Sequence, residues 1–167
     1  MGHSICALIV GEPFDDRAAR QWGVVGLPVG ERLRLVHISH YYTAYMQGRR
    51  GETAELDVPA DFPDVFPREA VVASLAAALA ADVPGKRTST FALVMADYFG
   101  GIGDQWACAY VEGRRVETVG DINAALRVLG VQAAEGLDEF DTVGLARHRS
   151  TPDYLDRYAD FCDEDGV

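Results

Sequence analysis

Positive charge is scarce in this sequence of 167 residues. Lys86 is the only lysine, and 15 Lys and Arg residues face 26 Asp and Glu residues, which gives a formal net charge of −11. A surplus of negative charge repels phosphate groups, so the sequence argues against a nucleic acid or an anionic membrane as the partner. We expect a protein partner instead, and the charge favours a basic one.

Long apolar runs and paired cysteines are also missing. No segment approaches the roughly 20 apolar residues of a membrane span, and the N-terminus lacks the basic start and apolar centre of a signal peptide. The cysteines Cys6, Cys108 and Cys162 are odd in number and far apart, so no pair has the spacing of a zinc or redox motif. We therefore expect a cytoplasmic protein with reduced thiols, no metal and no cofactor.

Length and hydrophobic content indicate one globular domain. The chain is 49% hydrophobic and long enough to bury a substantial core. Apolar patterning predicts regular elements, with strands over 4–10, 31–39, 88–98 and 105–113, longer helices over 67–83, 120–130 and 149–162, and a short helix over 15–23. The expected fold is a single α+β domain over 1–162, mainly an antiparallel sheet with about three helices packed on it, followed by an acidic tail over 163–167.

Local signals mark several helix ends. Asp121 is expected to cap the helix over 120–130, and Gly130 suits the position just beyond its end. Thr151 is expected to cap the last helix, with Pro152 in its first position. The aromatic residues 40–47 are compatible with either a strand or a helix.

Residues 48–67 predict a long connection over the surface. This segment contains three prolines and several acids, and a short strand is expected within it at 54–58. Loops of this length with little regular structure are uncommon in compact domains and are often functional. We therefore regard the 48–67 loop as a candidate binding segment.

The stretch F-G-G-I-G-D-Q-W, residues 99–106, is the most unusual in the chain. Glycines that cradle a phosphate normally open a helix, whereas the alternating residues after this stretch predict a strand, which favours a hairpin. Three glycines nevertheless exceed what one turn needs. We predict that the tip of this hairpin is a binding site, formed by Phe99, Gly100, Gly101, Gly103, Asp104, Gln105 and Trp106.

Histidines and arginines form a second candidate site. His37 and His40 make an H-x-x-H pair whose side chains point to opposite faces on a strand and to one face on a helix. In the segment 138–150, Arg147, His148 and Arg149 follow three acids and can hold a carboxylate or a phosphate. Two histidines alone do not make a metal site. The alternative to a binding module is a small enzyme or small-molecule-binding protein, whose pocket would lie between the sheet and the 48–67 loop and gather His37, His40, Arg147 and His148.

Three motifs resemble those of a group of small uncharacterised bacterial proteins. They are F-G-G-x-G-x-Q-W (99–106), I-N-x-A-L-R-x-L-G (122–130) and D-E-F-D-T-x-G-L (138–145). The resemblance implies no activity, although small acidic bacterial proteins of this character include immunity proteins that neutralise toxins. No nucleophile elbow or activated cysteine is present. The sequence therefore favours a non-enzymatic protein-binding module over an enzyme.

Overall fold

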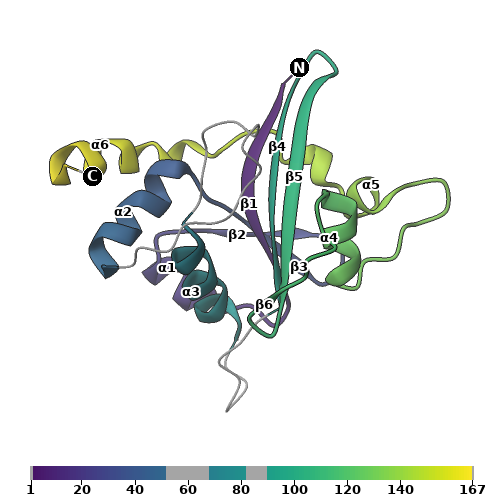
Figure 1. Cartoon of the computed structure of the whole chain (residues 1–167), viewed down its shortest axis with the longest axis horizontal. Coiled ribbons are helices and arrows are strands. Elements are labelled where there is room, and N and C mark those ends of the chain that lie inside the picture. The colour runs from purple at the N-terminus through teal and green to yellow at the C-terminus, as the bar shows by residue number, and fades with distance from the viewer. Residues whose placement is uncertain (1, 52–67, 82–89, 167) are drawn as a thin grey trace.

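A six-stranded antiparallel sheet forms the centre of the protein. The computed structural model describes residues 2–51, 68–81 and 90–166, and Figure 1 shows the chain with its sheet seen on edge. In spatial order the strands are β2 (Gly26–Val29), β3 (Leu33–His37), β1 (His3–Gly11), β4 (Phe91–Phe99), β5 (Ile102–Val111) and β6 (Arg114–Arg115). Every neighbouring pair is antiparallel.

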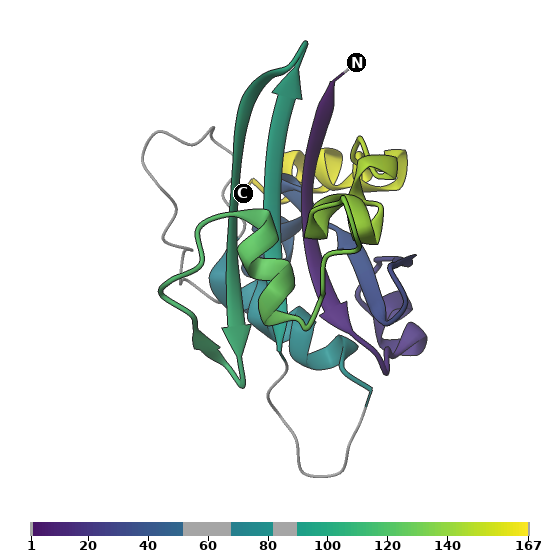
Figure 2. The ribbon, with the colours of Figure 1, turned by 90° about the vertical axis from the view of Figure 1, so that its right-hand side faces the viewer.

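Helices cover both faces of the sheet. Figure 1 shows one group on the left, formed by α1 (Asp16–Gln21), α2 (His40–Arg50), α3 (Glu69–Leu79) and α6 (Arg157–Asp165). The other face carries α4 (Ile122–Val128) and α5 (Glu139–Val143), which lie in front of the sheet in Figure 2. Two short 3₁₀ helices follow, at Leu145–Arg147 and Asp153–Leu155. We call the two sides of the sheet the α2 side and the α4 side.

Strand β1 is buried on both sides because its apolar residues alternate between two cores. Leu8 lies in the core beneath α2 and α3, while its neighbours Ala7 and Ile9 lie in the core beneath α4. Successive side chains of a strand point to opposite faces, so a continuous apolar run suits a strand with helices on both sides. Small side chains such as Ala92 and Ala107 form the sheet surface beneath α4, which lets the helix approach closely.

The predicted fold class is confirmed, but the number of helices is wrong. The described residues form six α-helices rather than about three. The aromatic segment after Ser39 is helix α2, whose first turn is capped when the Ser39 side chain accepts a hydrogen bond from the Tyr42 main-chain N–H. Helix α5 was not predicted because it has only five residues, most of them polar.

The cap predictions had mixed outcomes. The Asp121 side chain accepts a hydrogen bond from Ala124 N at 2.8 Å, and Gly130 has a φ of 87°, so both ends of α4 are confirmed. Thr151 does not cap a helix, because a 3₁₀ turn follows Pro152 and α6 starts only at Arg157. The acidic residues 163–165 form the last turn of α6.

Some expectations lie outside the described residues. They are the short strand at 54–58 and most of the 48–67 loop. Residues 48–50 are the last turn of α2.

All three cysteines are free and buried. Within the described ranges, no helix has the length and apolar character needed to cross a bilayer.

Candidate functional site

The glycine-rich stretch forms the turn of the hairpin between β4 and β5. Gly100 and Gly101 are its two loop residues, with φ angles of 61° and 84°. Positive φ at both loop positions is typical of the tight turns that match the twist of antiparallel strands. Strand β5 begins directly after the turn. The predicted hairpin is confirmed, and the alternative of a phosphate cradle at the start of a helix is wrong.

Gly103 is required for a different reason. It lies opposite Tyr98 on β4, and a Cβ at this position would overlap the Asp97 carbonyl oxygen and come within 2.6 Å of the Tyr98 Cα. A Cβ at Gly100 or Gly101 would meet no atom within 4 Å. The hairpin geometry therefore accounts for all three glycines without a ligand.

The end of the hairpin carries two exposed apolar side chains. Phe99 and Ile102 face each other across the strands and are 80% and 83% exposed. Figures 1 and 2 show this end of the hairpin extending beyond the helices, beside the N-terminus. We call these two residues the apolar tip. Phe99 was predicted from the sequence, whereas Ile102 was missed even though a large aliphatic residue among three glycines is itself a signal.

Two carboxylates lie next to the apolar tip on the α2 side. Asp97 and Asp104 are direct cross-strand partners, and both are exposed. Side chains in such pairs have Cβ atoms about 4.5–5.5 Å apart, so like charges there repel each other. The next pair inward, Met95 and Trp106, is buried in the core. We call Asp97 and Asp104 the acidic pair. Asp104 was a predicted binding residue and Asp97 was not.

The remaining predicted hairpin residues lie away from the apolar tip. Gln105 is on the α4 side, where its Oε1 accepts a hydrogen bond from Ile122 N at 3.4 Å. Trp106 is only 6% exposed, and the Arg115 guanidinium lies 5.7 Å from the centre of its ring. Trp106 is therefore a core residue and cannot act as an exposed aromatic anchor.

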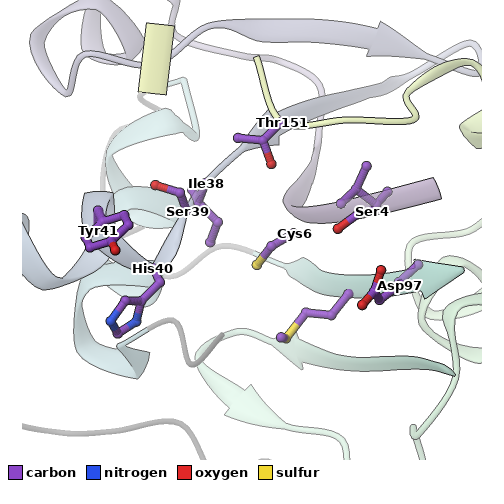
Figure 3. A pocket seen from close by; sticks show the side chains of 11 residues that line it. Ser4, Cys6, Ile38, Ser39, His40, Tyr41, Asp97 and Thr151 are labelled. Carbon is purple, nitrogen blue, oxygen red and sulfur yellow. The ribbon is translucent and has the colours of Figure 1, made fainter. Parts of the chain in front are cut away.

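A cleft of about 250 Å³ opens on the α2 side next to the acidic pair. Figure 3 shows Cys6 near its middle, with Ser4 and Asp97 on one side and His40 and Tyr41 on the other. Burial raises the pKa of the Cys6 thiol to about 12, so this cysteine stays protonated and is a poor nucleophile. We call this space the α2-side cleft. Asp97 is common to the cleft and the acidic pair.

The structure brings together two of the three predicted histidines. His37 and His148 have ring centroids 6.1 Å apart, whereas His40 lines the α2-side cleft on the other side of the sheet. Burial, and then the neighbouring His148, lowers the pKa of His37 to about 4. The pKa of His148 is lowered by burial first, and then by Arg147 and His3. The histidines therefore form no shared pocket of the kind that the alternative prediction requires.

The arginines beside His148 lie on the surface of the α4 side. Arg147 ends a 3₁₀ helix and Arg149 follows in the connecting segment, with both residues exposed. The Arg149 carbonyl accepts a hydrogen bond from Ser4 N at 2.9 Å, which ties this segment to the start of β1. Arg149 also lines a second cleft, together with His3.

Polar contacts link the second and third sequence motifs. Asn123 on α4 donates to Asp138 Oδ2 at 3.2 Å and accepts a hydrogen bond from Phe140 N at 2.8 Å. The Arg127 guanidinium lies 3.0 Å from the Glu139 carboxylate. These contacts hold α5 against α4, so several of the motif residues have structural roles.

Comparisons with protein-family models, with curated proteins and with solved structures find no match to this chain. Among the described residues, no group of three or more His, Cys, Asp or Glu side chains is arranged to hold a metal ion. The site must therefore be interpreted from its own geometry. Its features are the apolar tip, the acidic pair and the two clefts beside the hairpin.

Proposed function

We propose that this protein is a non-enzymatic protein-binding module whose main contact is the apolar tip. The observation that carries the proposal is the cross-strand pair of Phe99 and Ile102, each at least 80% exposed. Large side chains this exposed contribute nothing to the core, and each can contribute about 1.5–3 kcal/mol when a partner buries it. The β4–β5 ladder also holds the pair in position, which lowers the entropic cost of binding.

The acidic pair indicates the chemistry of the partner. Asp97 and Asp104 repel each other in the free protein, and the whole chain carries a net charge of −11. A lysine or arginine placed between the two carboxylates would relieve this repulsion and form charge-assisted hydrogen bonds. The partner we propose is therefore a basic protein, with an apolar patch against the tip and a cation against the acidic pair.

The α2-side cleft extends the same surface. Asp97 belongs to it, and its other lining residues include the apolar side chains Cys6 and Met95. A partner seated on the tip and the acidic pair would thus reach the cleft without crossing to another face. The 48–67 loop stays part of the proposal as a prediction from the sequence.

Site-specific photo-crosslinking tests where the partner binds. A photoreactive residue replaces Ile102 in one variant and Leu137 in the other, because Leu137 is also an exposed aliphatic residue at 50%. In cells of the source organism, position 102 should capture one protein that position 137 does not. Equal capture at both positions, or no capture at either, would contradict the proposal.

Neutralising the acidic pair gives an independent test. The double variant Asp97→Asn/Asp104→Asn should stabilise the free protein by about 0.2–1 kcal/mol, because it removes a like-charge pair. The same variant should slow association with the captured partner, and the dependence of the association rate on salt should weaken. Glu31→Gln/Glu117→Gln, which changes two acids outside the hairpin, is the control. Equal association rates for the two double variants would rule out a role for the acidic pair.

A further inference from the structure

A second cleft, of about 320 Å³, lies on the α4 side beside the hairpin, near its turn. We call it the α4-side cleft. Its lining comes from β1, the β4–β5 hairpin, α4 and the segment 138–149. Each of the three motifs singled out in the sequence contributes to it, through Gln105, Asn123 and Phe140 respectively. The volume is at the lower end of the range of small-molecule sites, about 300–1,000 Å³.

The apolar part of this lining suits a flat molecule. Tyr98 and Phe140 contribute aromatic rings, while Ala96 and Ala146 are small and leave space between the other groups. Aromatic rings bind other rings by stacked or edge-to-face contacts at centroid distances of about 4.5–7 Å. A single planar ring is therefore the body that fits this lining best.

The polar part of the lining favours a negative charge. Arg149 uses its carbonyl to accept a hydrogen bond from Ser4 N, but no described residue accepts one from its guanidinium. His3 Nε2 is buried with no partner among the described residues. The carboxylate of Asp138 is the opposing charge, but it already accepts hydrogen bonds from Asp141 N at 2.8 Å and from Asn123 at 3.2 Å. The Arg149 guanidinium and His3 Nε2 therefore remain available as hydrogen-bond donors, while the carboxylate of the cleft is already engaged.

The surroundings reinforce this positive character. Arg147 adjoins His148 and Arg149 in the sequence. Burial, and then the charge of Arg147, lowers the pKa of His148, so Arg147 adds a positive charge near neutral pH and His148 does not. In a chain with a net charge of −11, Arg147 and Arg149 place two positive charges close together at this corner of the α4 side. An anionic ligand would meet attraction here and repulsion over most of the remaining surface.

We propose that the α4-side cleft binds a small planar molecule that carries a carboxylate. Its ring would lie against Tyr98 and Phe140, and its carboxylate would accept hydrogen bonds from the Arg149 guanidinium, with His3 as a second donor. A planar guanidinium matches a carboxylate with two parallel hydrogen bonds. The site lies on the opposite side of the sheet from the acidic pair, so it does not depend on the proposed protein partner.

Nuclear magnetic resonance titration of the full chain with three probes tests the ligand chemistry. Benzoate has the proposed ring and charge, benzamide has the same shape without the charge, and inorganic phosphate has charge without a ring. Benzoate should shift the amide signals of Tyr98, Phe140 and Arg149 in a saturable way, with a dissociation constant on the order of 1 mM for so small a fragment. Benzamide and phosphate should each bind about tenfold more weakly or not at all.

Two arginine variants test the assigned contact. Arg149→Gln should weaken benzoate binding about tenfold or more and leave benzamide binding unchanged. The matched control is Arg147→Gln, which removes a neighbouring charge but not the direct contact. This control should weaken benzoate binding less than about threefold. Both residues are exposed, so both variants should fold. Equal binding of benzoate and benzamide, shifts confined to other regions, stronger binding of phosphate, or no effect of Arg149→Gln would each overturn the proposal.

Discussion

His37 should make the protein sensitive to mild acid. It is the last residue of β3, is 3% exposed, and has a buried Nδ1 with no partner among the described groups. The ring that faces it belongs to His148, which is itself close to Arg147 and His3. Among the described residues, no carboxylate accepts a hydrogen bond from the buried Nδ1 of His37, so the folded protein offers poor conditions for its protonated form.

The size of the effect follows from the difference between two pKa values. His37 has a pKa of about 4 in the folded protein and an ordinary value of 6.5 when exposed. Since the unfolded chain binds the proton first, the free energy of unfolding falls as the pH drops from 6.5 towards 4. At about 1.4 kcal/mol per pKa unit, the full loss is about 3 kcal/mol, and about 2 kcal/mol is lost by pH 5.

Urea unfolding at pH 7.5 and pH 5.0 measures this loss. The wild type should lose about 2 kcal/mol more stability between the two pH values than the variant His37→Leu. Leucine fills a similar volume but cannot bind a proton. The comparison cancels the carboxylates, because they are the same in both proteins. If the two proteins lost stability equally, the account of His37 as a buried neutral histidine would be wrong.

Three other substitutions test parts of the fold by chemical denaturation. Gly103→Ala should cost about 1–3 kcal/mol, because the new methyl group overlaps the facing strand; unchanged stability would refute the close approach. Asn123→Ala should cost about 1–3 kcal/mol, because the Phe140 N–H and the Asp138 carboxylate lose their shared partner, and hydrogen exchange should increase in α5 rather than in α2. Tyr42→Phe should cost about 1 kcal/mol, because its buried phenol donates to a main-chain carbonyl; a neutral effect would show that this hydrogen bond adds nothing.

The elements with strong local signals were the ones that the sequence predicted. The hairpin at Gly100–Gly101 and the Asp121 cap follow from backbone chemistry that acts over a few residues. Strand β2 was missed because Pro28 within G-L-P-V is typical of a turn. Proline is tolerated here because β2 is an edge strand, where a missing N–H breaks no inner ladder.

The candidate sites were harder to predict because they depend on side-chain direction and on distant segments. The sequence predicts Trp106 as part of the tip, yet strand alternation places it opposite Met95 and facing the core. The α4-side cleft joins His3 to Arg149, which are separated by almost the whole chain. Local patterns predicted Arg149 as a binding residue, but only the folded chain brings His3 near it, where the Ser4 N–H donates to the Arg149 carbonyl.

The most direct test of the proposed function is the affinity of the partner captured at position 102 for two matched double variants. Phe99→Ser/Ile102→Ser removes the apolar tip, and Val25→Ser/Leu137→Ser removes two aliphatic side chains that are 51% and 50% exposed elsewhere. We predict that the first variant binds at least about 100-fold more weakly, from about 1.5–3 kcal/mol for each buried side chain, while the control binds like the wild type. Equal affinity of the tip variant and the wild type, with both folded, would contradict the account.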